Sequence, residues 1–220
     1  MRGFTLLLSL LLLLMGCGGG ASSALGGGTG AGEGDGNSGG QGDGTDGDTG
    51  SGQASTSLSY AERSAAQGAL LADFHAQTGG TATAAGRRPM AGQAIHRGFA
   101  DITLSGGPSA QSMNGDLDMV VNFGQGTLIG SITTLRRSDD VPLGGTLYVR
   151  DGQMGAGGGG TISGRLEGTL TEARGALDFD AAVSGDFYGP SAEFTRGTIA
   201  GSVQSGAGSL SAEGNFLAGR

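Results

Sequence analysis

Few side chains in this sequence are of the kinds that carry out chemistry. Cys17 is the single cysteine, His75 and His96 are the two histidines, and all twelve basic residues are arginine. One thiol excludes an internal disulfide framework and any structural zinc site that needs several thiolates. Without lysine there is no P-loop lysine, Schiff-base lysine or Ser-Lys dyad. We therefore expect that this protein is not an enzyme and holds no cofactor or metal ion.

Two patterns resemble catalytic motifs but lie in the wrong context. Gly155-x-Gly157-x-x-Gly160 matches a dinucleotide fingerprint in form. It leads into a predicted strand rather than a helix, so no helix N-terminus would face a phosphate. The carboxylates of Asp178 and Asp180 alternate with apolar residues and are predicted on a solvated strand face. The net charge of −8 argues against nucleic acid as a partner, because phosphate binding requires a basic face.

The chemistry expected at Cys17 is acylation. Residues 4–14 are almost all apolar and follow Arg2, and as a helix they would span about 16 Å, too short for the ~30 Å hydrocarbon core. Residues 1–16 are thus typical of a signal peptide. The run Leu14-Met15-Gly16-Cys17 resembles the lipobox of bacterial lipoproteins. The resemblance implies a lipid anchor on Cys17 and, with Gly18 next, a place at the outer membrane, either surface-exposed or facing the periplasm.

A tether and a short helix are predicted to follow the anchor. Residues 17–57 are so rich in glycine, serine and aspartate that they cannot bury enough apolar surface to offset their ordering entropy. Residues 58–77 are predicted to be a helix, because Ser59 and Glu62 have the form of a capping box and 79–80 are both glycine. Its apolar stripe includes Leu70, Leu71 and Phe74. This stripe would dock on the main domain or, alternatively, be offered to a partner.

From residue 88 onward the apolar residues recur with a period of two. This pattern predicts an all-β domain over 88–220, most simply an eight-stranded antiparallel β-barrel whose closure removes exposed edges. Phe123, Phe179 and Phe187 are expected inside, and Asp178, Asp180 and Asp186 outside. The scarcity of aromatic residues disfavours a lipid-facing barrel. The predicted strands are 93–104, 116–123, 127–134, 145–150, 161–170, 176–188, 195–203 and 209–217.

One run within the strands carries a resemblance to a known family. Phe187-Tyr188-Gly189-Pro190-Ser191-Ala192-Glu193, followed by a strand containing Gly201, resembles the β-barrel domain of transferrin-binding protein B-like lipoproteins. The hairpin at 122–132 supports this resemblance. It implies the barrel fold, the lipid anchor and the class of binding lipoprotein. The chain has room for one barrel and no separate handle domain, so the resemblance does not extend to transferrin. We expect structural roles for Phe187, Tyr188, Gly189, Pro190, Ala192 and Glu193.

These observations favour a monomeric outer-membrane lipoprotein that binds a solute or protein and is related to iron and haem acquisition receptors. Its partners would be the membrane, through Cys17, and an extracellular protein or an iron or haem carrier, with a TonB-dependent receptor as a further partner. Two alternatives stay open: a structural envelope lipoprotein without a dedicated ligand, and a lipocalin-like carrier with a small molecule inside the barrel.

Recognition is predicted to use loops, because a barrel of eight strands has little free lumen. The candidate loops are 106–115, 136–142 and 151–160. The second carries Arg136, Arg137, Asp139 and Asp140, which give one tip charges of both signs. Such a tip suits a protein partner more than an apolar ligand.

Overall fold

The structure is a computed structural model that describes residues 58–155, 161–173 and 175–220. Contacts divide the chain into two units, Met1–Ser51 and Gly52–Arg220, and every described residue belongs to the second. The predicted signal peptide, Cys17 and the tether lie outside the described residues. So does most of the glycine motif that begins at Gly155.

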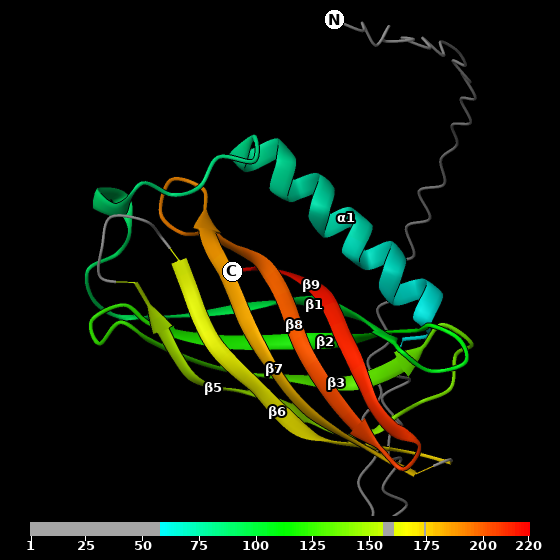
Figure 1. The fold of residues 1–220 in the computed structure, drawn as a ribbon. Coiled ribbons are helices and arrows are strands. Elements are labelled where there is room, and N and C mark those ends of the chain that lie inside the picture. The colour runs from blue at the N-terminus through cyan, green and yellow to red at the C-terminus, as the bar shows by residue number, and fades with distance from the viewer. Residues whose placement is uncertain (1–57, 156–160, 174) are drawn as a thin grey trace, which may run out of the picture. The chain divides into compact units, whose positions relative to one another are not determined.

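Eight long antiparallel strands form a closed barrel in the order β1-β2-β3-β5-β6-β7-β8-β9, with β9 paired to β1 and β6 to β7 (Figure 1). A two-residue strand, β4, pairs with the end of β6. The all-β fold and the eight-stranded barrel predicted from the sequence are confirmed. The strands are β1 (Gln93–Ser105), β2 (Gln111–Asn122), β3 (Thr127–Arg137), β4 (Gly144–Gly145), β5 (Leu147–Met154), β6 (Thr161–Glu172), β7 (Gly175–Tyr188), β8 (Phe194–Ser205) and β9 (Gly208–Gly219).

Three strands extend into the candidate loops, and this shortens all three loops. β2 begins at Gln111 rather than 116, because its ladder with β1 continues until Gln111 lies opposite Leu104. β5 runs on to Met154 past an irregularity in its ladder with β6. The first candidate loop is therefore only 106–110, and residues 151–154 of the third belong to a strand. β3 continues to Arg137, so Arg136 and Arg137 lie in a strand rather than at a loop tip, and the second loop is 138–143.

The lumen of the barrel is packed with apolar side chains, as the alternation predicts. Phe123, Phe179 and Phe187 are all buried in one continuous core cluster. The ring of Phe216 packs against β7 and β8, where a Cβ added at Gly185 or Gly197 would lie 2.9 or 2.6 Å from it. Glycine is thus needed at these two strand positions to make room for the ring.

The outer wall of the barrel is polar. Asp178 and Asp180 are exposed as predicted, but Asp186 is only partly exposed, so that part of the prediction is wrong. Asp186 lies between Thr161 and Arg196 in the ladders of β7 with its two neighbours, which cover it from both sides. Ion pairs on the outer wall join Arg97 to Asp118, Arg150 to Glu167 and Arg165 to Asp180. Charged pairs at these positions suit a wall that faces water rather than lipid.

The helix α1 (Tyr60–Thr78) lies against the outside of the barrel (Figure 1). The predicted capping box of Ser59 and Glu62 is present, and Gly79 ends the helix in the left-handed conformation with φ 56°. Phe74 is fully buried against Phe194 and Leu217, with Leu70, Leu71 and Tyr188 around them. The apolar stripe is therefore covered by the barrel. No helix in the described part of the chain is both long and apolar enough to cross a membrane.

Residues 79–92, which we call the strap, connect α1 to β1 across one end of the barrel. The strap includes a short 3-10 helix, η1 (Ala85–Arg87). The Thr83 amide donates to the Phe187 carbonyl at 2.8 Å, and the Thr83 hydroxyl donates to the Gly189 carbonyl at 2.6 Å. The Phe123 amide donates to the Gly92 carbonyl at 3.0 Å. We call this the strap end of the barrel, and the opposite end the cavity end.

Candidate binding site at the cavity end

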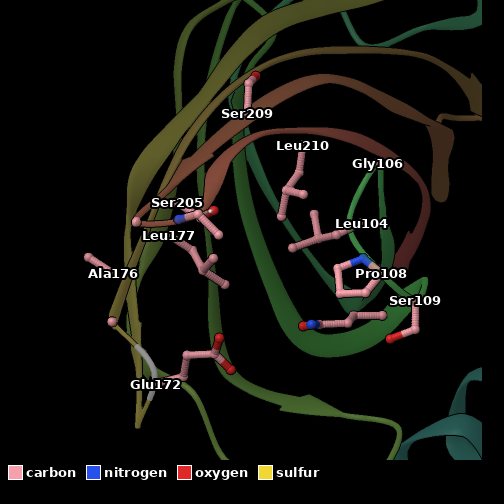
Figure 2. Close-up of a pocket in the computed structure, with 15 residues that line it drawn as sticks. Leu104, Gly106, Pro108, Ser109, Glu172, Ala176, Leu177, Ser205, Ser209 and Leu210 are labelled. Atoms are coloured by element: carbon pink, nitrogen blue, oxygen red, sulfur yellow. Dashed lines mark hydrogen bonds between the residues drawn. The ribbon is translucent and has the colours of Figure 1, made fainter.

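A cavity of about 570 Å³ lies at the cavity end, among the turns that join β1 to β2, β6 to β7 and β8 to β9. Figure 2 shows Leu104, Leu177 and Leu210 pointing into one space from three strands. Glu172, Gln111 and several serines complete the wall. The volume falls within the ~300–1,000 Å³ of typical ligand pockets, and an apolar floor with a few polar groups is their usual lining.

The strand register places the apolar floor at the rim of the core. Leu104 is the last inward residue of β1, and Leu177 is the first buried residue of β7, opposite Leu170. Leu170 is itself buried in the core cluster. The described residues of the turns around this layer are mostly glycine, serine, alanine and proline, whereas Arg174 of the β6–β7 turn lies outside the described residues. The cavity is therefore a shallow opening that ends on a packed interior.

A chain of ion pairs connects the cavity wall to the loop after β3. The Arg137 guanidinium lies 2.8 Å from Glu172, a cavity residue whose side chain is only 9% exposed, and it also holds Asp139. Hydrogen bonds to Asp139 and Glu172 raise the pKa of Arg137, and the same contact lowers the pKa of Asp139. Arg137 thus fixes one wall residue of the cavity and one residue of the rim.

The second half of the predicted charged tip is also tied into the fold. Arg136 donates to the backbone carbonyl of Asp140 at 2.9 Å, and the Tyr60 amide donates to the Asp140 carboxylate at 2.8 Å. Asp140 has φ 65°, a left-handed conformation that aspartate tolerates in turns. The loop 138–143 therefore links the cavity end of the barrel to the start of α1.

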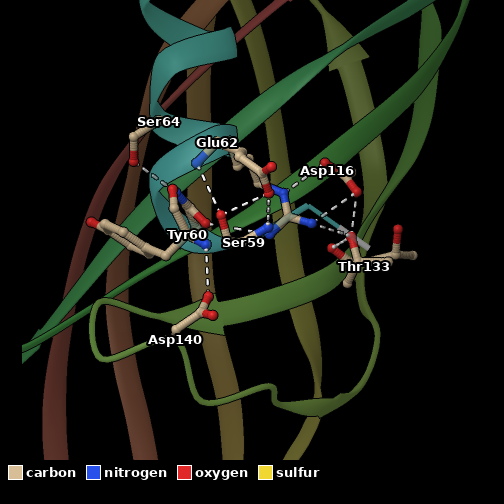
Figure 3. A network of polar contacts seen from close by, with 10 residues as sticks. Ser59, Tyr60, Glu62, Ser64, Asp116, Thr133 and Asp140 are labelled. Carbon is tan, nitrogen blue, oxygen red and sulfur yellow. Dashed lines mark hydrogen bonds and ion pairs between the residues drawn. The ribbon is translucent and has the colours of Figure 1, made fainter. Parts of the chain in front are cut away.

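A buried arginine holds the first turns of α1 against β2 and β3 (Figure 3). Arg63 is 0% exposed, and its Nε donates to the Asp116 carboxylate at 2.8 Å. It also donates to Asn114 and to Thr134, whose hydroxyl donates in turn to Asp116. Asn114 donates to the Tyr60 carbonyl and to the Ser64 hydroxyl.

The backbone of β2 and β3 is shaped around this network. The register of the two strands shifts between Asn114 and Asp116, and Thr134 has φ 50°, which is uncommon for a threonine. Sequence analysis missed this network. The signal that could have found it is spacing, because Arg63 lies seven and eleven residues before Leu70 and Phe74, on the same helix face.

The family-like run forms the turn between β7 and β8 at the strap end. Phe187 is fully buried in the lumen, and Tyr188 makes an edge contact with Phe74 at 5.0 Å between ring centroids. Gly189 has φ 90° and Ala192 has φ 63°. Pro190 lies exposed in the turn, and the Glu193 carboxylate accepts a hydrogen bond from the Ser191 amide at 2.8 Å. This run joins the end of β7 to the start of β8, whereas the cavity is lined by the start of β7 and the end of β8, so the two lie at opposite ends of the same strands.

The two histidines lie in different elements, His75 on α1 and His96 on β1. His75 is exposed on α1, next to Phe74. His96 is fully buried at the strap end, with Nε2 2.9 Å from the Ala192 carbonyl, and burial lowers its pKa. Within residues 58–155, 161–173 and 175–220, no three His, Cys, Asp or Glu side chains are grouped so that they could hold a metal ion.

The structure separates the three candidate loops. The first two, at 106–110 and 138–143, meet at the cavity end. The third follows β5 and belongs to the strap end, and residues 156–160 lie outside the described residues. A further cavity, of about 530 Å³, lies at the strap end and is lined by Arg88, Met90, Phe123 and Met154. Because two of the three candidate loops meet at the cavity end, we take that end as the candidate site.

Comparison with known proteins concerns the barrel. No family model and no curated protein matches the chain. Among solved structures, a single mutant of Transferrin Binding Protein B (TbpB) from Haemophilus parasuis Hp5 matches with a TM-score of 0.48 and 24% identity, over 64% of this chain and 28% of that chain. A double mutant of the same protein gives 0.46 and 23%, with the same coverage. Intact Ap-TbpB, with its N and C lobes, gives 0.46 and 20%, again with the same coverage.

This chain thus matches little more than a quarter of the length of those proteins. The resemblance to transferrin-binding protein B that the sequence indicated is found at the level of the barrel fold. At this degree of similarity it carries no argument about function.

Proposed function

We propose that this protein is an outer-membrane lipoprotein, anchored through an acylated Cys17, whose barrel binds an extracellular protein or an iron or haem carrier. The observation that carries the proposal is the cavity end, where Leu104, Leu177 and Leu210 form an apolar floor inside a rim of polar turns. Protein recognition sites share this arrangement of an apolar centre and a polar rim.

The packed lumen directs recognition to this end of the barrel. Val121, Phe179, Leu166 and Ile102 are all buried within the core cluster, so the interior is occupied by the protein's own side chains. This packing disfavours the lipocalin-like alternative, in which a small molecule lies inside the barrel. The ligand would instead lie across the mouth, in contact with the turns.

The anchor can be tested in cells. Cys17→Ser is expected to abolish acylation and to release the protein from the membrane fraction, because the tether itself offers no apolar anchor. If the variant still sediments with membranes after a high-salt wash, the lipoprotein proposal is wrong. Protease treatment of intact cells then separates the two faces of the membrane, because only a surface-exposed barrel is digested.

The binding function can be tested with one blocking variant and one matched control. Ala207 is exposed and lines the cavity at the β8–β9 turn, whereas Ala200 is exposed on the outer wall of β8. Immobilised wild type and Ala200→Trp should retain the same protein from the growth medium or from host fluid, and Ala207→Trp should not. If all three retain it equally, the cavity end is not the site. If nothing is retained and protease does not reach the barrel, the structural envelope alternative is favoured.

We further propose that a TonB-dependent receptor receives the cargo.

A further inference from the structure

The charged side chains at the cavity end form two layers. The side chains of Asp139 and Asp140 are 51% and 55% exposed, whereas those of Arg137 and Arg136 are 17% and 20% exposed. Glu62 is exposed as well, on the first turn of α1, whose Tyr60 amide is bonded to Asp140. We call these five residues the described rim of the cavity. Its carboxylates face outward, and its guanidinium groups lie beneath them.

Two of the outward carboxylates, those of Asp139 and Glu62, are held in their charged form by hydrogen bonds. Hydrogen bonds from Arg137 lower the pKa of Asp139, and those from the Ser59 amide and hydroxyl lower the pKa of Glu62. The described rim and Glu172 of the cavity wall together hold four carboxylates near two arginines. Their potential extends over about 8 Å at physiological ionic strength and attracts cationic groups.

The described carboxylates around the cavity disfavour an anionic ligand. A fatty acid seated on Leu104, Leu177 and Leu210 would bring its carboxylate toward Glu172, which lies in the cavity wall. Glu172 and Asp139 already engage the Arg137 guanidinium, and Arg174 of the β6–β7 turn lies outside the described residues. Because like charges across an interface disfavour a partner, the described carboxylates favour a ligand that presents positive charge around an apolar group.

The extent of the rim favours a protein segment over a small cation. The carboxylates reach from the cavity wall at Glu172, through the loop after β3, to Glu62 on α1. We propose that the cavity end binds a basic segment of a protein partner, with one apolar side chain in the cavity and flanking Arg or Lys residues paired with Asp139, Asp140 and Glu62. This inference deepens the proposed function and rests on it. The aspartates then contact the partner, and Arg136 and Arg137 hold the aspartates in place.

A peptide library tests this inference without knowledge of the partner. The probe is a library of disulfide-constrained heptapeptides, selected against the secreted chain carrying Cys17→Ser, which avoids a detergent that would compete for the cavity. We expect the selected peptides to combine a central Leu, Ile, Phe or Trp with flanking Arg or Lys. Their affinity should fall with added salt, because the contacts at the rim are between exposed charges.

Three variants locate the bound peptides. Ala207→Trp should weaken binding by about tenfold or more by filling the cavity mouth, and Ala200→Trp on the outer wall should leave it unchanged. Asp139→Asn keeps the size of the side chain and removes one charge. It should weaken binding about two- to fivefold and reduce the salt dependence, as expected for one rim ion pair. Thermal unfolding of each variant confirms that the barrel is intact.

The outcomes separate this inference from the proposed function. If the selected peptides are acidic or neutral but lose binding in Ala207→Trp, the cavity end binds peptides and the inferred charge of the partner is wrong. If binding survives Ala207→Trp, neither the inference nor the cavity end as the site can stand. If selection yields no binding peptide, the inference is overturned, and the capture experiment alone decides the proposed function.

Discussion

The two ends of the barrel are built from the same eight strands but finished differently. At the strap end, residues 79–92 bond to the Phe187 and Gly189 carbonyls, and the rings of Phe123 and Phe187 lie together beneath them. At the cavity end, Leu104, Leu177 and Leu210 lie beneath short turns, and the described part of the chain places no segment like the strap across them. Both ends border a cavity of similar volume, about 570 Å³ at the cavity end and about 530 Å³ at the strap end. The difference lies in the strap and its hydrogen bonds, which we expect to concentrate stability at the strap end.

The largest effect is expected when the strap end loses an aromatic side chain. Phe187→Ala should lower the free energy of unfolding by about 3–5 kcal/mol, because the ring is fully buried and its removal leaves a cavity. The matched change at the cavity end, Leu210→Ala, should cost about 1 kcal/mol, because that side chain is only partly buried. Urea denaturation of both variants measures the difference. Equal losses would remove the contrast between the ends.

Arg63 tests whether α1 is held as firmly at the cavity end as at the strap end. Breaking a buried ion pair typically costs about 3–5 kcal/mol. Because Asp116 is 39% exposed and can be hydrated, we expect Arg63→Ala to cost about 2–3 kcal/mol, below that range. Hydrogen exchange should show faster exchange at the start of α1, near Tyr60 and Ser64, while the amides around Phe74 stay protected. Uniform loss of protection along α1 would instead mean that the helix is released as one unit.

These contrasts show what could be predicted from the sequence and what could not. Periodicity of two predicted the strands and the burial of Phe179, because it depends only on neighbours along the chain. The capping box at Ser59 and the end of the helix at Gly79 could be predicted for the same reason, because both depend on residues a few positions apart in the sequence. The cavity could not be predicted, because it depends on which turns meet after closure. The contacts of Arg63 with β2 and β3 are long-range, and the sequence shows the arginine but not its carboxylate.

The charged tip shows a further limit of sequence analysis. Arg136, Arg137, Asp139 and Asp140 were predicted as a binding surface with both signs exposed, and their binding role stays a prediction. The sequence contains the charges but not their depth. The structure places the arginines below the aspartates, since Arg137 on β3 pairs with Glu172 on β6.

His96 gives the strap end a dependence on pH. Burial lowers the pKa of His96 from its usual 6.5, so the unfolded chain binds a proton more readily than the folded one. Stability is therefore complete above pH 6.5 and declines as the pH falls toward the folded pKa, by at most about 1.4 kcal/mol per pH unit. Denaturation midpoints between pH 7.5 and 5 should show this decline in wild type and not in His96→Gln, which keeps a donor for the Ala192 carbonyl. An unchanged slope in the variant would assign the decline to other groups.

Carboxylates also contribute to the pH dependence of stability. Burial raises the pKa of Asp101 from 3.8, so the folded chain binds this proton more readily than the unfolded chain. Asp101 therefore raises the free energy of unfolding as the pH falls, which is opposite to the effect of His96. The pKa values of Glu62, Asp139 and Asp180 are lowered, so these carboxylates reduce stability only in more acidic solution, where they become protonated. Because these carboxylates are the same in wild type and in His96→Gln, the difference between the two profiles isolates the buried imidazole.

The smallest effect is expected on the outer wall between the two ends. Arg165 and Asp180 lie 3.0 Å apart with side chains 54% and 63% exposed, so water solvates both charges. Such pairs contribute about 0–1 kcal/mol, and Glu167 remains within 3.7 Å of Arg165 when Asp180 is removed. We therefore expect Asp180→Ala to change the free energy of unfolding by no more than about 0.5 kcal/mol. Urea denaturation at low and high salt checks this, with Arg63→Ala as the buried counterpart. If Asp180→Ala lowers the free energy of unfolding as much as Arg63→Ala does, burial does not decide how much each ion pair contributes to stability. The ion pairs of the outer wall would then also stabilise the barrel.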